Sequence, residues 1–210
     1  MTIKQRIIQI IALCLAVAAP VHSRADAQPL TLESIRQLSG MEMVAVKGGC
    51  FQMGEFILES AFDEKPVHEV CVADFIIGKY EVTQGQWRRI MGNKPSNFKD
   101  CGDSCPVEQI SWDEAQQFIR RLNQMTGLQF RLPSEAEWEY ACRSGGKQET
   151  FCGGNDINLL AWHHDNSGGR PHPVGLKQPN GLGIHDMSGN VWEWVQDWFD
   201  REYYSKSPRM

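Results

Sequence analysis

The sequence lacks an apolar run that could cross a bilayer as a helix. The apolar stretch from Ile7 to Ala19 is shorter than the roughly 20 residues that a membrane-spanning helix needs, and no later segment is apolar enough. Basic clusters are also missing. The formal net charge is −5, and the charged residues are scattered along the chain. We therefore expect no membrane span and no binding to nucleic acid or to an anionic membrane surface.

The first 27 residues instead have the pattern of a secretory signal. Basic residues precede the apolar stretch, and small residues at positions 25 and 27 form a cleavage site before Gln28. Removing 27 of the 210 residues leaves 183, the size of one ordinary domain. We expect a periplasmic or secreted monomer in which residues 28–42 form a helical extension and residues 43–210 form the domain.

Seven cysteines are present, and one of them, Cys14, lies in the predicted signal. The six that remain are an even number in an exported chain, which favours disulfides. Short separations in sequence, and the prospect of paired strands, favour local pairings over the others that six cysteines allow. We predict the bridges Cys50–Cys71, Cys101–Cys105 and Cys142–Cys152. A reactive or metal-binding thiol pair in the segment CGDSC is the alternative, but no C-x-x-C pair or histidine ligand pattern accompanies it.

Local patterns predict an α+β domain with much irregular structure. Residues 31–38 have the apolar spacing of a short amphipathic helix that Gly40 ends. Residues 43–54 and 67–77 are rich in β-branched and aromatic residues and predict strands. The stretch 145–183 is dominated by Gly, Asn, Pro and His, and irregular structure of this length is unusual unless it is functional or cross-braced.

Three helices are predicted to begin at capping boxes, in which a Ser or Thr is followed three positions later by Glu or Gln. The second helix has its apolar residues on one face and ends at Gly127, and the third ends near Gly145. We expect these helices to pack on the core. The capping pairs are Thr83 with Gln86, Ser111 with Glu114, and Ser134 with Glu137.

Histidines in the irregular stretch suggest a transition-metal site. His163, His164 and His172 lie near Asp165, and histidine is the commonest ligand of such metals. Adjacent histidines cannot both point the same way in an extended chain, however, and no motif such as H-E-x-x-H is present. An exposed polar loop is the favoured interpretation.

The tryptophans are expected to form core rather than a binding box, because aromatic burial stabilises a domain of this size. Trp162, in the irregular stretch, is the exception that we least expect to be buried. The others are Trp87, Trp112, Trp138, Trp192, Trp194 and Trp198.

Four segments occur in an order and spacing that resemble the formylglycine-generating enzyme family, also called sulfatase-modifying factor domains. The most specific are RLPSEAEWEYA (131–141) and DMSGNVWEW (186–194). The others are GKYEVTQGQW (78–87) and PVEQISWDEA (106–115). The resemblance runs from about Met43 to Trp198 and implies a loop-rich, C-type-lectin-like α+β fold.

The segment DMSGNVWEW suggests a calcium site. Asp186 and Glu193 supply hard carboxylate oxygens, and Gly189 permits a tight turn that directs a carbonyl inward. If a strand begins at Val191, residues 191 and 193 share one face, and Trp192 and Trp194 pack on the other. The resemblance implies the same ligands, namely the side chains of Asp186 and Glu193 and the backbone oxygens of Gly189 and Val191. The alternative is a turn stabilised by Asp186 and Asn190, with Glu193 in solvent.

Other family features depart from the pattern here. A second calcium site would need an Asn near Trp162 and an Asp further on, whereas this chain has the shortened loop AWHHDNSGGRPHPVG, so we expect no second ion. Family enzymes are implied to use oxygen and a copper ion held by two cysteine thiolates, the soft ligands that suit Cu(I). Those cysteines would follow an Arg-Gly-Gly-Ser-like stretch that this chain lacks. We therefore expect a C-terminally incomplete domain, assign no catalytic residue, and expect copper only if a further segment exists.

Three functions remain open at this point. By resemblance the chain is an exported oxidase that matures a cysteine of a target protein such as a sulfatase. Alternatively, it is a non-catalytic, calcium-stabilised module that binds a partner protein or peptide. The third hypothesis is a truncated, inactive remnant.

Overall fold

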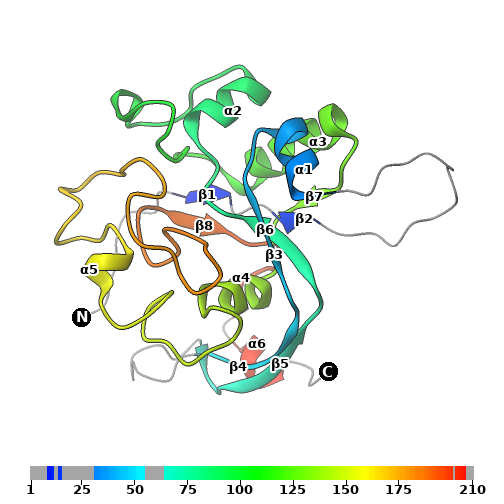
Figure 1. Cartoon of the computed structure of the whole chain (residues 1–210), viewed down its shortest axis with the longest axis vertical. Coiled ribbons are helices and arrows are strands. Elements are labelled where there is room, and N and C mark those ends of the chain that lie inside the picture. The colour runs from blue at the N-terminus through cyan, green and yellow to red at the C-terminus, as the bar shows by residue number, and fades with distance from the viewer. Residues whose placement is uncertain (1–8, 12–13, 16–30, 55–63, 201, 207–210) are drawn as a thin grey trace, which may run out of the picture.

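A computed structural model of the chain describes residues 9–11, 14–15, 31–54, 64–200 and 202–206. Helices α1 to α3 gather at one end of the molecule, the β4–β5 hairpin lies at the other, and long loops from the later part of the chain run along one side (Figure 1). Within the described ranges, no helix combines the length and the apolar character that crossing a bilayer requires. The rest of the predicted signal and residues 28–30 lie outside the described residues.

Most helices and strands are short, and four strands follow one another between α1 and α2. The strands are β1 (Gln9–Ile11), β2 (Cys14–Leu15), β3 (Met43–Val46), β4 (Gly49–Met53), β5 (His68–Val72), β6 (Phe75–Gly78), β7 (Phe130–Arg131) and β8 (Trp192–Trp194). The helices are α1 (Leu32–Ser39), α2 (Gln84–Met91), α3 (Trp112–Thr126), α4 (Glu135–Cys142), α5 (Ile157–Leu160) and α6 (Tyr203–Lys206), with a 3₁₀ turn at Lys99–Cys101.

Each of the two predicted strand segments is divided in two. Strands β3 and β6 pair in a four-stranded sheet of order β3-β6-β2-β7, and β4 and β5 form a separate antiparallel pair. The break falls at Gly48, whose N–H donates to the Asp74 carboxylate at 2.9 Å. A Cβ at Gly48 would lie 2.3 Å from the Val72 carbonyl oxygen, so only glycine allows the two strands to bend together here.

Two segments of the predicted signal are strands in the uncleaved chain. Strand β1 pairs in parallel with β8, and β2 lies between β6 and β7. Removal of residues 1–27 would therefore leave the edges of β6, β7 and β8 without these partners. Cleavage before Gln28 stays a prediction.

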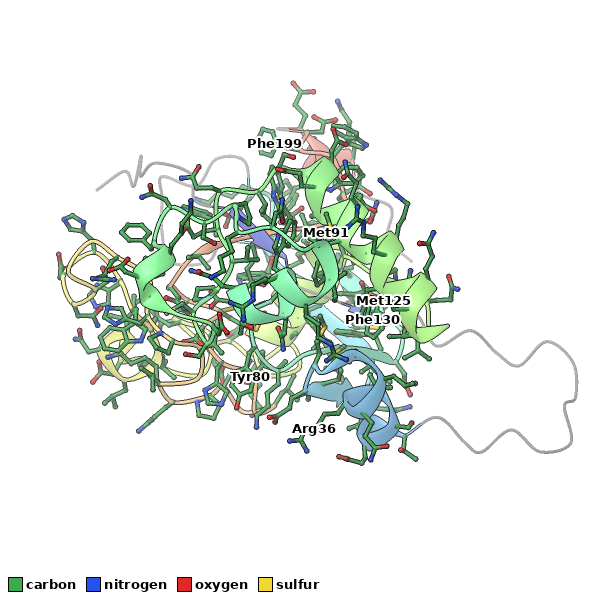
Figure 2. All side chains as sticks on the ribbon, turned by 90° about the horizontal axis from the view of Figure 1, so that it is seen from above. Arg36, Tyr80, Met91, Met125, Phe130 and Phe199 are labelled. Carbon is green, nitrogen blue, oxygen red and sulfur yellow. A yellow bond between two sulfur atoms is a disulfide. The ribbon has the colours of Figure 1, made fainter. Side chains whose placement is uncertain are left out.

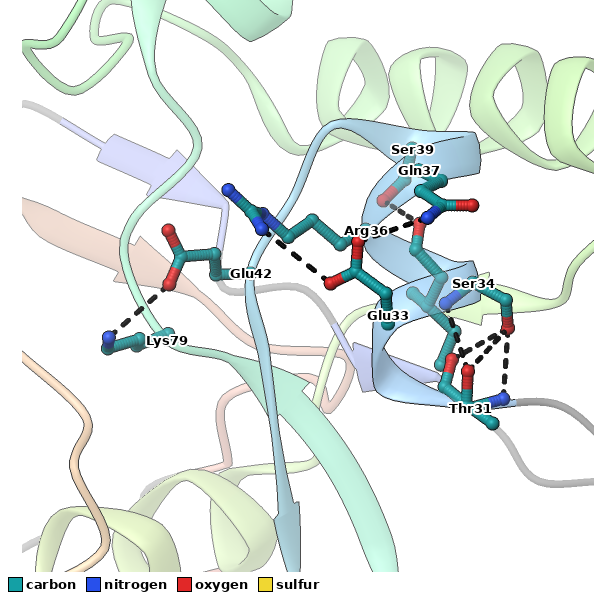
Figure 3. Close-up of polar contacts among 9 residues, drawn as sticks. Thr31, Glu33, Ser34, Arg36, Gln37, Ser39, Glu42 and Lys79 are labelled. Carbon is teal, nitrogen blue, oxygen red and sulfur yellow. Dashed lines mark hydrogen bonds and ion pairs between the residues drawn. The ribbon is translucent and has the colours of Figure 1, made fainter.

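All three predicted capping boxes are present, and α1 has a fourth. Its cap is Thr31, whose side chain accepts from the Ser34 N–H at 3.1 Å, while the Thr31 N–H donates to Ser34 Oγ at 2.9 Å (Figure 3). A serine thus fills the position for which the sequence analysis required Glu or Gln. The caps of α2, α3 and α4 are Thr83, Ser111 and Ser134.

The structure contains all three predicted disulfides, Cys50–Cys71, Cys101–Cys105 and Cys142–Cys152. The first joins residues that lie directly opposite each other in the β4–β5 pair. The third fastens the irregular stretch after α4 to the end of that helix. One cross-link therefore braces a pair of strands, and another braces the irregular stretch after α4.

Two apolar clusters form the core, one beneath α1 to α3 and one between α4 and the β4–β5 hairpin. Trp87 is 1% exposed, and its ring stacks on Phe118 with centroids 5.2 Å apart. Trp192 and Trp198 were also expected to lie in the core. This is wrong, because their side chains are 55% and 88% exposed. Trp194 packs on the first cluster. Trp192 and Trp194 share one face of β8, so this face is covered at Trp194 and open to solvent at Trp192.

Replacement of Trp87 by alanine is expected to lower the free energy of unfolding by about 3–5 kcal/mol, because it leaves a cavity beside Phe118. It also leaves the Asn93 side chain without the indole N–H, which donates to it at 2.7 Å. Urea unfolding followed by circular dichroism measures the effect. Leu38→Ala removes a side chain that is 46% exposed and should cost less than about 1 kcal/mol. Equal losses in the two variants would contradict this account of the core.

A candidate cation site in the DMSGNVWEW segment

The segment from Asp186 to Trp194 begins with a compact turn. Asp186 and Asn190 have φ values of 65° and 61°, in the left-handed region that Asp and Asn tolerate better than other residues with a side chain. The Gly189 N–H donates to the Asp186 carbonyl at 3.1 Å, and the Val191 N–H donates to the Gly189 carbonyl at 2.8 Å. The chain therefore turns between Asp186 and Val191, immediately before β8 begins.

Close packing against the Trp162 backbone holds this turn in place. The Asn190 N–H donates to the Trp162 carbonyl at 2.7 Å. A Cβ on Gly189 would lie 2.2 Å from the same oxygen, closer than any side chain can approach. Only glycine fits at position 189, because any side chain would collide with the Trp162 backbone. This reason adds to the tight turn that the sequence suggested.

Two buried carboxylates meet at this turn. Asp186 is 2% exposed, and its Oδ2 accepts from the Gly175 N–H at 2.7 Å. Glu81, which precedes α2, is 3% exposed, and its Oε2 accepts from the Asn190 side-chain amide at 2.7 Å. The second oxygen of each, Asp186 Oδ1 and Glu81 Oε1, is buried and has no hydrogen-bond partner. Such orphaned carboxylate oxygens are costly unless a proton or a cation occupies the space beside them.

Glu193 adds a third carboxylate. The indole N–H of Trp138, on α4, donates to Glu193 Oε2 at 3.0 Å. Burial raises the pKa of Glu193 to about 7; the Trp138 hydrogen bond lowers it and the Asp186 charge raises it further. The prediction of an exposed Glu193, which was the alternative to a cation site, does not hold for this half-buried side chain.

The three carboxylates also act on one another. Burial raises the pKa of Glu81 well above its ordinary value, and the charges of Asp186 and then Glu193 add to this, against the Asn190 amide and the Val191 N–H. Burial likewise raises the pKa of Asp186, opposed by the Gly175 N–H and His185. Within the described residues, no lysine or arginine forms an ion pair with any of the three. The three acidic groups therefore share a buried region in which no lysine or arginine among the described residues pairs with them.

This donor set fits a hard cation. Carboxylate and carbonyl oxygens are the ligands that calcium prefers, and the structure brings Asp186 and Glu193 into one electrostatic cluster with Glu81. The carboxylate oxygens of Glu81, Asp186 and Glu193 do not all lie within 4.8 Å of one another. Among the described residues, the only group of three potential metal ligands that does so is Cys50, Glu69 and Cys71. Both of those sulfurs are bonded in a disulfide. A cation beside Asp186 would therefore need the backbone carbonyls of the turn as well.

Glu81 could not be assigned to this site from the sequence. Its segment GKYEVTQGQW contributed to the family resemblance, but no spacing links it to DMSGNVWEW, since Glu81 and Asn190 are 109 positions apart. The available signal was an acidic residue between Tyr80 and Val82, immediately before a capping box. A carboxylate at such an apolar position is a reason to expect burial with a specific partner.

Two histidines of the irregular stretch, His163 and His172, contact protein side chains. The His172 ring stacks on Trp162 with centroids 3.8 Å apart, and Lys177 Nζ lies 4.1 Å from the centroid of the Trp162 ring in a cation–π contact. His163 Nε2 is 2.9 Å from Asn158 Oδ1. No cluster of three metal-ligating side chains among the described residues includes a histidine. Trp162 is half-buried within this stack.

Comparison with known proteins agrees with the fold and the motifs. The structure resembles "Treponema denticola variable protein 1", with a TM-score of 0.66 and 27% identity over 74% of this chain and 72% of that one. It also resembles PvdO from Pseudomonas aeruginosa, with a TM-score of 0.65 and 27% identity over 80% of this chain and 74% of that one. These likenesses define an α+β protein with the fold of formylglycine-generating enzymes, as the sequence predicted.

The family follows from the sequence comparison. The model of the sulfatase-modifying factor enzyme 1-like domain matches residues 28–210, so the chain belongs to the formylglycine-generating enzyme family. It is similar to the chaperone protein LppX of Paenibacillus barcinonensis, with 32% identity over 75% of this chain and 71% of that protein. It is also 36% identical to the formylglycine-generating enzyme of Streptomyces coelicolor, over 49% of this chain. In that case it spans only 35% of the enzyme's length.

Proposed function

We propose that this chain is an exported, calcium-stabilised binding module of the family, and that it acts by holding a partner polypeptide rather than by oxidising a cysteine. The state of its cysteines carries the proposal. All six that follow Cys14 are paired in disulfides. Copper chemistry of the family type needs two thiolates, and a sulfur in a disulfide is neither a thiolate nor a ligand for Cu(I).

The names of relatives support a binding role. LppX, the relative that matches 75% of this chain, is named a chaperone protein. The serine/threonine-protein kinase pkn1 of Chlamydia pneumoniae matches 79% of this chain at 28% identity, over 29% of its own length. The same domain thus occurs in proteins whose names describe other activities than formylglycine generation. By analogy with the chaperone, the partner of this chain would be a protein or peptide.

In this proposal calcium has a structural role. The carboxylates of Asp186 and Glu193 would hold the ion together with the carbonyl oxygens of Gly189 and Val191, and the Glu81 carboxylate would add negative charge nearby without being a third carboxylate ligand. The charge of the ion would offset the mutual repulsion of the carboxylates and occupy the space beside the two orphaned oxygens. The turn and β8 would then be held against α4 through the Glu193–Trp138 hydrogen bond.

The alternative function is the oxidation of a cysteine in a target protein such as a sulfatase. The observation that favours it is the 36% identity with the Streptomyces coelicolor enzyme over 117 residues. It requires copper and a pair of free thiolates. The six described disulfide sulfurs do not supply them.

Metal binding separates the two functions. We expect isothermal titration of the metal-free, non-reduced protein to show one calcium ion bound per chain, and competition with bicinchoninate to show no tightly bound Cu(I). Glu81→Gln should weaken calcium binding at least tenfold, because it removes a buried carboxylate whose charge acts on Asp186 and Glu193. Glu33→Gln is the matched control, since Glu33 is exposed on α1 and should leave affinity unchanged. Retention of Cu(I) together with oxygen consumption in the presence of a cysteine-containing peptide would contradict the binding proposal.

A further inference from the structure

Residues of β5 and α6 line a groove of about 880 Å³. These two elements lie at the end of the molecule opposite α1 to α3 (Figure 1). One wall is strand β5, another is the beginning of α4, and the third is formed by residues 196–200 together with Tyr203 and Tyr204. It is separate from the cation site, since none of Glu81, Asp186 and Glu193 lines it. The inference drawn below about the ligand of this groove rests on the binding function proposed above.

The groove runs along the free edge of β5. Four consecutive residues, 70–73, line it, and successive side chains of a strand point to opposite faces, so the groove follows the strand's edge rather than one face. Strand β4 contributes only Met53 to the lining, and in the described part of the chain β4 is the only strand that pairs with β5. Unpaired backbone donors and acceptors along such an edge can accept a further strand.

Aromatic side chains border this edge. Trp198 and Phe199 line the groove and are 88% and 79% exposed, and Figure 2 shows Phe199 at the periphery of the molecule beside α6. Two hydrogen bonds hold the segment that carries these two aromatic residues. The Gln196 N–H donates to the Pro133 carbonyl at 2.8 Å, and the Glu135 N–H donates to the Asp197 carboxylate at 2.5 Å. Exposed aromatics on an anchored segment are typical of sites that bind a polypeptide.

The charge of the groove is of one sign. Its lining includes Glu64, Glu135, Glu137, Asp197 and Asp200 but no lysine or arginine. Arg131 neutralises Glu137 from outside the lining. Burial and then the negative charges of Glu135, Glu139 and Glu64 raise the pKa of the Tyr204 hydroxyl at the base of the groove. An apolar floor with an acidic border is complementary to a segment that carries both apolar and basic side chains.

We propose that this groove binds an extended segment of a partner polypeptide in which basic and apolar residues alternate. The segment adds to the free edge of β5 as a third strand. Its apolar side chains pack on Trp198 and Phe199, and its basic side chains face the acidic border.

The test measures fluorescence anisotropy of labelled ten-residue peptides with the full chain in the presence of calcium. The probe alternates Lys with Leu, and its control has Glu in place of Lys. We expect the Lys peptide to bind at least tenfold more tightly than the Glu peptide. Methylation of alternate backbone nitrogens of the Lys peptide removes the strand's donors and should weaken binding by a similar factor.

A pair of variants locates the binding surface. Trp198→Ala combined with Phe199→Ala should weaken binding of the Lys peptide at least tenfold. Leu176→Ala removes a side chain that is 61% exposed outside the groove and should leave binding unchanged. All three side chains are exposed, so the variants should fold, and circular dichroism verifies this.

The outcomes separate this inference from the function on which it rests. Undiminished binding by the double variant, or equal binding of the Lys and Glu peptides, would overturn the groove while leaving a binding module in place. If neither peptide binds, and the folded chain also fails to suppress aggregation of a reduced, unfolded protein, both the groove and the binding function are wrong.

Discussion

In calcium-free buffer, the free energy of unfolding is expected to fall as the pH is raised from 5 to 8. Burial raises the folded-state pKa of Glu193 from 4.5 to about 7, so the folded chain holds this proton more tightly than the unfolded chain does. The stability that the protonated group contributes is fully present below about pH 4.5 and is lost as the pH rises through 7. At about 1.4 kcal/mol per pH unit, this difference corresponds to roughly 3 kcal/mol. Glu81 and Asp186 shift in the same direction and add to the slope.

Calcium should reverse this loss, because it favours the charged carboxylates that the metal-free fold disfavours. Urea unfolding at pH 5, 6, 7 and 8, with either EDTA or millimolar calcium, measures both effects. The gain from calcium should grow with pH, since a ligand that binds only the folded state stabilises it according to its concentration and affinity.

Glu81→Gln should act in opposite directions in the two buffers. Without calcium it removes one buried negative charge beside Asp186 and should raise stability at pH 8. With calcium it should reduce the gain, because a negative charge close to the ion is lost. Glu33→Gln should change neither value appreciably. Stability that rises between pH 5 and 7 in EDTA, or a curve that millimolar calcium does not move, would contradict the site.

Gly189→Ala is expected to lower the free energy of unfolding by about 3 kcal/mol. The added Cβ would lie 2.2 Å from the Trp162 carbonyl oxygen, and rotation of a side chain cannot relieve a clash between two backbones. Moving the turn away would break the hydrogen bond from the Asn190 N–H to the same oxygen. Thermal and urea unfolding measure the loss, and calcium titration should show weaker binding because the Gly189 carbonyl would move.

Gly183→Ala is the matched control for this substitution. Gly183 has a φ of +83°, and a Cβ added there would meet no atom within 4 Å, so its cost comes from backbone conformation alone. That cost is about 1–2 kcal/mol. If Gly189→Ala were no more destabilising than Gly183→Ala, and calcium affinity were unchanged, the close contact at Trp162 would not be the reason for a glycine at position 189.

Features that depend on neighbours in sequence could be predicted well. The capping boxes at Thr83, Ser111 and Ser134 are present because each needs only a side chain and a backbone N–H three positions away. The cap at Thr31 was missed because serine replaces the usual Glu or Gln at its third position. The disulfides could be predicted because they join cysteines 21, 4 and 10 positions apart.

Burial of the aromatic residues could be predicted only in part. Trp192 and Trp194 share a face of β8 by their spacing, yet only Trp194 packs on the core. Its indole N–H reaches the Ile110 carbonyl at 3.2 Å, in a segment 84 positions away. Periodicity states which side chains share a face, whereas the cover over that face comes from distant segments.

The DMSGNVWEW segment shows where the two kinds of information divide. The sequence by itself determined the family, the turn, and the oxygen-bearing residues Asp186 and Glu193, because these lie within one short motif. The tertiary structure alone placed Glu81 against them, left one oxygen of Glu81 and one of Asp186 without a partner, and put the Trp162 backbone against Gly189. The physical reason is that desolvation and charge repulsion depend on which groups share a buried space, and the chain path that brings them there is not local.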